Sequence, residues 1–134
     1  MSKESLVKMA LDLGFTENEV AVPFEIFFEG NTFKGSIMPN VLPESPDPQN
    51  LYNFLKELKL SGDVREIYVR ICELNDNWAF SDSIYVYTGL FMMDLEEKFE
   101  EFEPDEIKIG WMYDRPNGVS EIEESDQVYT VWWD

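Results

Sequence analysis

The run Val128–Trp133, with the sequence VYTVWW, places large apolar side chains on both faces of any strand that it forms. Side chains of a strand alternate between its two faces, and a half-exposed strand buries only one of them. Here Val128, Thr130 and Trp132 share one face, and the opposite face is equally apolar. Apolar residues on both faces are typical of a strand that is covered on both sides. We therefore predict that this strand is interior to a sheet, or that one of its faces meets a partner.

The rest of the chain alternates between helical and strand-like patterns. Apolar side chains recur every three or four residues in segments 2–13, 48–61 and 94–103, which predicts three helices. The other patterned segments predict three hairpins, at residues 23–38, at 64–73 with 83–88, and at 106–113 with 127–133. The sequence thus predicts one α+β domain over residues 1–134, with a mostly antiparallel sheet of about six strands and about three helices covering it.

The charge of the chain narrows the classes of partner that it can bind. Among its 134 residues are 28 acidic and 10 basic ones, which gives a net charge of −18. The aromatic share of 15% is nevertheless that of a folded protein rather than a disordered one. A strongly negative surface repels phosphates, so nucleic acid and anionic membranes are not expected as partners. The charge permits a basic protein partner or a cation, or it serves solubility alone.

Several classes of catalytic site are excluded by composition. The chain has no histidine, which removes every Ser-His, Cys-His and imidazole–zinc arrangement. The single Cys72 cannot form an internal disulfide or a zinc cage, and the seven glycines form no phosphate-binding motif. A pair of carboxylates could still act as in glycosidases, but sequence spacing does not test their separation. We predict no catalytic residues, no metal site and no cofactor, and we favour binding over catalysis.

The compartment is predicted from two observations. Residues 1–14 are polar and amphipathic, unlike a signal peptide, and no apolar run reaches the length of a membrane-spanning helix. A lone cysteine is typical of proteins that work in a reducing environment. We therefore predict a cytoplasmic location.

Two acidic clusters flank the last predicted hairpin. One is the predicted helix 94–103, in which glutamates four residues apart repel each other, and the other is the loop 120–126. The clusters can be read as a solvated outer face, or as one merged patch that steers a basic partner. The second interpretation predicts an inhibitor or immunity-like protein. Its partner-binding residues would be Glu96, Glu97, Glu100, Glu101, Glu121, Glu123, Glu124 and Asp126.

Aromatic side chains on the predicted strands 64–73 and 83–88 form a second candidate surface. If the aliphatic residues of these strands face the core, three tyrosines and an arginine gather on the other face. Aromatic pairs across strands can simply stabilise a sheet, whereas an uncovered aromatic face is typical of a binding wall. The alternative function is therefore a small-molecule- or peptide-binding domain, or a carboxylate-dependent enzyme. Its predicted pocket residues are Tyr68, Arg70, Trp78, Tyr85 and Tyr87. The apolar content also leaves a homodimer open.

Overall fold

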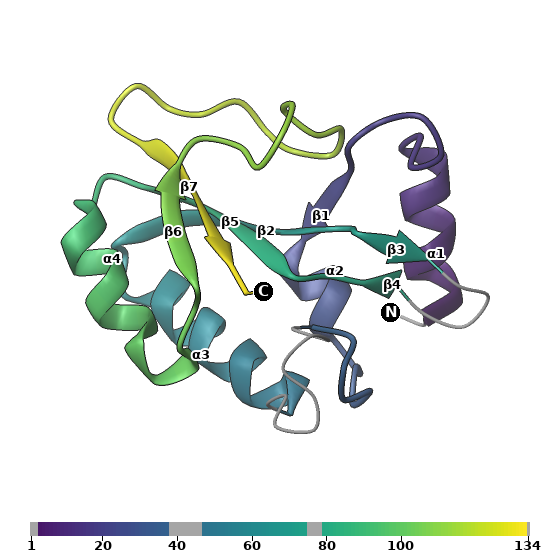
Figure 1. Cartoon of the computed structure of the whole chain (residues 1–134), viewed down its shortest axis with the longest axis horizontal. Helices are drawn as coiled ribbons and strands as arrows, with labels where there is room; N and C mark the ends of the chain where they lie inside the picture. Colours follow the sequence, from purple (N-terminus) through teal and green to yellow (C-terminus); the bar gives the residue numbers. More distant parts are fainter. Residues whose placement is uncertain (1–2, 38–46, 75–78, 134) are drawn as a thin grey trace.

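The computed structural model describes residues 3–37, 47–74 and 79–133 (Figure 1). These form an α+β fold around a five-stranded sheet in the order β1-β2-β5-β7-β6, in which all neighbours are antiparallel. A separate two-stranded sheet pairs β3 with β4. The large sheet contains β1 (Ala21–Pro23), β2 (Val64–Arg70), β5 (Ser83–Thr88), β6 (Glu106–Ile109) and β7 (Gln127–Trp132). The small sheet contains β3 (Glu73–Leu74) and β4 (Ala79–Phe80). The antiparallel α+β prediction is confirmed.

The helices begin and end at residues with a local reason to do so. Asp47 caps the third helix, because its Oδ1 accepts a hydrogen bond from the Gln49 amide at 2.9 Å and Pro48 occupies the first helical turn. Gly14 follows the first helix with a φ of +90°, the left-handed conformation that favours glycine. The described helices are α1 (Lys3–Asp12), α2 (Phe24–Phe28), α3 (Pro48–Leu60) and α4 (Met92–Phe99), which continues as the 3-10 turn η2 (Glu100–Phe102).

The prediction of an interior last strand is confirmed. Strand β7 lies between β5 and β6, and Val131 pairs with Ile84 on one side and Ile107 on the other. Tyr129 and Val131 belong to the main core, while Val128 belongs to a smaller core on the opposite face of the sheet. Both faces of β7 are therefore buried.

The predicted hairpin at 23–38 is wrong. A three-residue strand, β1, leads directly into the short helix α2, which buries Phe24, Phe27 and Phe28. These three positions have the spacing of one helical face, whereas the hairpin interpretation relied on the alternation of Phe24, Ile26 and Phe28. Five residues are too few for the two periods to be told apart.

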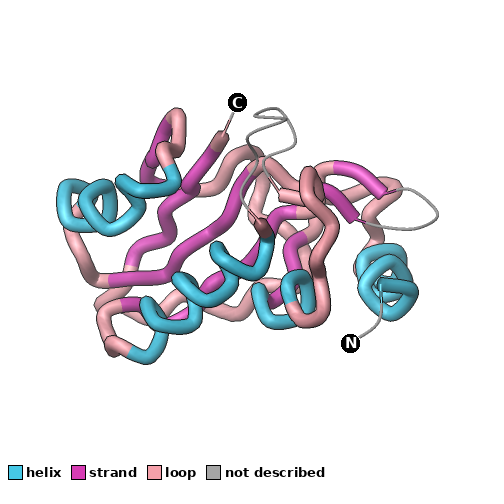
Figure 2. Tube along the Cα trace, turned by 90° about the horizontal axis from the view of Figure 1, so that it is seen from below, coloured by secondary structure: helices cyan, strands magenta, loops and turns pink. Residues whose placement is uncertain are grey.

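The two faces of the sheet are covered in different ways. Helices α2, α3 and α4 pack on one face, and α3 crosses in front of the strands when the molecule is seen from below (Figure 2). The other face is covered by the segment Gly110–Asp126, the yellow-green loop above the sheet in Figure 1, which we call the strap. The strap contains no helix or strand. Its apolar side chains that pack on the sheet are Trp111, Met112, Val119 and Ile122.

Candidate functional site

The four predicted contact residues of this region, Glu96 and Glu97 in α4 and Glu100 and Glu101 in η2, lie on its outer side. Leu95 and Phe99 turn toward the core, which leaves the glutamates exposed to solvent. Lys98, the basic residue of this helix, forms an ion pair with Asp63 at 3.6 Å. No ion pair within the described part of the chain involves the predicted set Glu96, Glu97, Glu100 and Glu101. The charge of this helix face is therefore available to a partner.

The acidic residues of the strap are held differently. Arg65 lies 2.6 Å from Asp126 and 3.4 Å from Glu123, and Arg115 lies 3.3 Å from Glu121. The Asp126 carboxylate is only 6% exposed, so it serves the fold rather than an outer surface. Glu123 and Glu121 remain exposed at 60% and 89%. Three of the four predicted strap residues thus already have an internal counter-ion.

The two acidic clusters meet only at one end of α4. The start of this helix lies close to the end of the strap, because a Cβ at Gly89 would stand 3.1 Å from the Ser125 carbonyl oxygen. The Tyr129 hydroxyl also donates a hydrogen bond to the Leu90 carbonyl oxygen at 2.9 Å. From there α4 runs away from the strap toward the start of β6 (Figure 1). A helix rises 1.5 Å per residue, so Glu100 lies about 12 Å beyond Met92.

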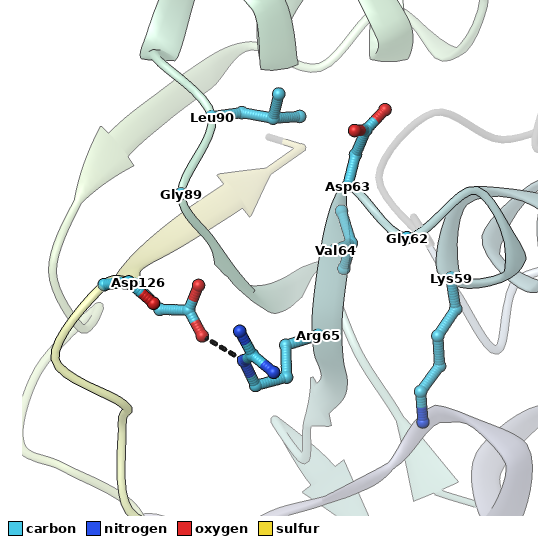
Figure 3. Close-up of a pocket in the computed structure, with 9 residues that line it drawn as sticks. Lys59, Gly62, Asp63, Val64, Arg65, Gly89, Leu90 and Asp126 are labelled. Atoms are coloured by element: carbon cyan, nitrogen blue, oxygen red, sulfur yellow. Dashed lines mark hydrogen bonds and ion pairs between the residues drawn. The ribbon is translucent and has the colours of Figure 1, made fainter.

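A groove occupies this end of the molecule, between the end of α3 and the start of α4. One cavity of about 550 Å³ is lined by Lys59, Gly62, Asp63, Val64, Arg65, Gly89, Leu90, Ser125 and Asp126 (Figure 3). A neighbouring cavity of about 560 Å³ shares Asp63 and Leu90 with it and adds Asp94, Glu97 and Lys98. We call the two cavities together the end groove.

The basic residues of the end groove are all engaged. Arg65 and Lys98 form the ion pairs described above, and Lys59 lies 3.4 Å from Glu66 and 3.7 Å from Glu25. No ion pair among the described residues involves Asp94 or Glu97. Four carboxylates and three basic side chains thus line the groove, and the two carboxylates without an ion pair among the described residues suit a cationic group better than an anionic one.

Exposed apolar side chains stand beside the end groove. Leu60, the last residue of α3, is 86% exposed. Phe91 and Met93, at the start of α4, are 78% exposed each. Isolated exposed apolar residues are common, but two large ones next to carboxylates without counter-ions are typical of an interface.

The tyrosine face exists as predicted, but it is not open. Tyr68, Tyr85 and Tyr87 lie on one side of β2 and β5, and their side chains are 5%, 0% and 0% exposed under the strap. Trp111 packs edge-on against Tyr85 and Tyr87 with ring centroids 5.0 and 6.0 Å apart. Burial raises the pKa of Tyr87 to about 12 and that of Tyr85 further. The fourth predicted aromatic residue, Trp78, lies outside the described residues.

Arg70, the fifth predicted pocket residue, is part of a buried polar cluster. Its Nε donates a hydrogen bond to Glu19 at 2.8 Å, and its side chain is 12% exposed. One terminal nitrogen lies 3.0 Å from the Cys72 sulfur and 3.5 Å from the Asp82 carboxylate. The guanidinium also lies over the Tyr113 ring at 5.0 Å. Arg70 thus balances two carboxylates inside the protein and does not line an open wall.

The Cys72 thiol donates a hydrogen bond to Asp82 at 3.1 Å. Burial raises the pKa of Cys72 to about 11, and the charge of Arg70 opposes this only in part. The side chain is therefore a neutral thiol at physiological pH, which is unsuited to nucleophilic attack.

Comparison with known proteins shows the family of this chain. The family model described as "Uncharacterized protein YfbO family" matches residues 1–132. The chain belongs to the YfbO family. A relative from Escherichia coli (strain K12), described as "Uncharacterized protein YfbO", is 36% identical over 112 residues, which is 82% of this chain and 79% of the relative. No solved structure matches the chain.

The described residues of this YfbO-family chain also bear on metal binding and on membrane insertion. Within residues 3–37, 47–74 and 79–133, no three side chains of the metal-binding types gather closely enough to hold an ion. Each helix within these described residues is too short or too polar to span a membrane.

Sequence reasoning missed the apolar residues that stand beside the end groove. Phe91 precedes Leu95 by four residues, so it continues the stripe that Leu95 and Phe99 bury. Such a pattern predicts burial, yet Phe91 is the residue that caps α4 and has an extended backbone. A side chain at this position does not follow the face of the helix, which is why its exposure was not predictable.

The raised pKa of Cys72 predicts a loss of stability in alkali. The unfolded thiol loses its proton near the ordinary pKa of 9.0, whereas the folded protein keeps it up to about 11. The free energy of unfolding should therefore fall as the pH rises from 9 to 11, by at most about 3 kcal/mol from this group. Urea denaturation of the wild type and of Cys72→Ser at several pH values measures the effect. The serine variant should show the shallower fall, because it keeps a hydroxyl donor but does not titrate there.

If the free energy of unfolding falls equally steeply with pH in the wild type and in Cys72→Ser, the raised pKa of Cys72 is contradicted. Tyr85 and Tyr87 also have pKa values that burial raises, but they titrate in both proteins. The difference between the two pH dependences of the free energy of unfolding therefore reports the ionisation of the Cys72 thiol alone.

Proposed function

We propose that this protein is a binding module for a basic protein surface, in the manner of an inhibitor or immunity protein. The observation that carries the proposal is the placement of Phe91 and Met93, each 78% exposed, beside the carboxylates of α4 that have no counter-ion in the described structure. Interfaces are commonly built from such apolar anchors with a charged rim. The partner surface would present apolar side chains surrounded by lysine or arginine.

The arrangement of charge on α4 supports this proposal. Glu96 and Glu97 each have a like-charged neighbour four residues later, which costs a few tenths of a kcal/mol per pair. Glu100 and Glu101 also lie near the carboxyl end of the helix, where the helix dipole disfavours negative charge. A solvated helix face does not require charges in these positions. A basic partner would relieve both effects on binding.

The test is capture of a basic protein from an extract of the source organism at about 50 mM salt, with release at 0.5 M salt, where charges are strongly screened. The immobilised wild type is compared with a variant in which Glu96, Glu97, Glu100 and Glu101 are all replaced by glutamine. We expect the wild type to retain a basic protein and the variant to lose most of it. A second variant, Phe91→Ala with Met93→Ala, keeps every charge and should also weaken retention at about 50 mM salt.

The matched control changes the same number of charges elsewhere on the surface. Exposed carboxylates away from α4 serve this purpose, and the control set is Glu17→Gln, Glu57→Gln, Glu73→Gln and Asp114→Asn. The control should bind like the wild type. If the α4 variant and the control retain the same proteins equally well, the α4 surface is not the binding site.

The lone cysteine bears on where the protein works, and its net charge bears on which other partners it can bind. The single Cys72, a half-buried free thiol, supports a reducing cytoplasmic compartment. A second copy of the chain is a weaker candidate for this surface, because two chains with a net charge of −18 each repel one another. Nucleic acid is disfavoured for the same reason.

A further inference from the structure

One part of the strap makes no backbone–backbone hydrogen bond with the sheet among the described residues. This part is the segment Val119–Ser125, which we call the flap. It lies over Tyr68 and Tyr87, and only Val119 and Ile122 pack there with apolar side chains. We propose that the flap is a lid that opens as a local unit, that Arg65 is its latch, and that opening uncovers these two tyrosines.

The strap on the amino-terminal side of the flap is firmly anchored. The Gly110 amide donates to the Val128 carbonyl oxygen at 2.8 Å, as a continuation of the sheet. The Asn117 amide donates to the Glu19 carbonyl oxygen at 2.8 Å, and its side chain donates to the Leu13 carbonyl oxygen at 2.9 Å. Opening therefore begins after Asn117.

Gly118 marks the boundary between the anchored part and the flap. Its φ is +100°, and a Cβ at this position would stand 2.1 Å from the Ala21 carbonyl oxygen. The backbone can approach β1 this closely only because the residue is glycine. The chain then leaves β1, and the backbone of the described residues that follow makes no hydrogen bond with the backbone of the sheet until β7 begins at Gln127.

Two groups of polar contacts close the flap, and the exposed ion pair between Arg115 and Glu121 adds to them. The first involves Ser120, whose Oγ accepts a hydrogen bond from the Tyr68 hydroxyl at 2.9 Å and whose carbonyl oxygen accepts one from the Tyr87 hydroxyl at 2.7 Å. The second is Arg65, which reaches from β2 to Glu123 and Asp126. Arg65 is 46% exposed and Glu123 is 60% exposed, so salt screens their attraction.

The charge of the flap favours the open state. Glu121, Glu123 and Glu124 lie within four residues of one another and close to the negative end groove. Arg65 offsets this repulsion where the flap ends, and it is shared between two carboxylates. Removal of Arg65 should therefore release the flap without weakening the strands beneath it, whose hydrogen bonds do not involve that side chain.

Amide hydrogen exchange measured by NMR tests the proposal on the full chain. The Ser120 amide, which donates to the Tyr68 hydroxyl, and the Asp126 amide, which donates to the Glu123 carbonyl oxygen, report on the flap. The Gly110 and Asn117 amides report on the anchored part of the same strap. In Arg65→Gln we expect exchange of the two flap amides to rise about tenfold, because the variant loses both the exposed ion pair with Glu123 and the more buried one with Asp126, with the anchored amides unchanged.

The matched control is Lys8→Gln, which removes one charge and one exposed ion pair, that with Asp12 on α1. This control variant should leave the exchange rates of all four amides unchanged. In the wild type, 0.5 M salt should speed exchange of the two flap amides but not of the two anchored amides. Ser120→Ala provides a second variant that leaves Arg65 in place, and it too should speed Asp126 exchange. The proposal is overturned if the flap and anchored amides exchange at the same rate in the wild type and respond equally to these changes.

Discussion

Replacing Trp133 by alanine should lower the free energy of unfolding by about 3–5 kcal/mol, the cost of truncating a large aromatic side chain in a core. The indole of Trp133 is 1% exposed, and its Nε1 donates a hydrogen bond to the Phe102 carbonyl oxygen at 2.8 Å. This contact joins the end of β7 to the turn that follows α4. A domain of this size is stable by only about 5–15 kcal/mol, so the variant should be close to unfolding. Urea denaturation followed by circular dichroism measures the loss.

The control for this substitution is Trp133→Phe. Phenylalanine keeps much of the buried ring but cannot donate the hydrogen bond, so an intermediate loss is expected. Trp132→Ala should cost less than Trp133→Ala, because Trp132 is only half-buried and faces the other side of β7. A loss below about 1 kcal/mol in Trp133→Ala would contradict the packing of β7 described above.

Replacing Arg70 by methionine should also destabilise the protein, by about 1–3 kcal/mol, because it removes the cation from two ion pairs whose carboxylates are only partly buried. Methionine keeps most of the apolar stem, so the loss reports mainly on charge. The carboxylates of Glu19 and Asp82, which are 26% and 25% exposed, would then be partly buried with no cation between them. Chemical denaturation at neutral pH measures the effect.

Two further variants separate charge from geometry in this cluster. Arg70→Lys keeps the positive charge but cannot reach Glu19 and Asp82 with a planar fork of donors, so it should recover only part of the stability. Combining Arg70→Met with Glu19→Gln and Asp82→Asn removes the unbalanced carboxylates and should be more stable than Arg70→Met alone. If the triple variant is less stable, the cost of Arg70→Met does not arise from buried charge.

The elements that were predictable from the sequence are those with long, regular patterns. Helices α1 and α3 carry their apolar side chains on one face over three turns, and Asp47 with Pro48 gives α3 an unambiguous start. Strand β7 was predictable because both of its faces are apolar. Helix α2 was not, because five residues that include three phenylalanines fit a strand and a helix equally well.

The candidate site was less predictable, because its properties depend on contacts between distant residues. The acidic residues of α4 and of the strap can be read from composition, but not which of them have a counter-ion. Arg65 and Asp126 are 61 residues apart, and nothing local to either one predicts their ion pair. The same applies to the tyrosine face. The alternation of Tyr85 and Tyr87 shows that they share a face, but only the path of the strap shows that this face is covered.

The position of β7 also bears on how the protein folds during its synthesis. Strand β7 follows every other described strand in the chain, yet it lies between β5 and β6 in the sheet. Until the ribosome has released residues 127–132, β5 has an unpaired edge and β6 has no neighbour in the sheet. An exposed strand edge can pair with other chains, so the nascent protein should be most prone to misassociation in this interval. The sheet is therefore completed late, when β7 joins β5 to β6.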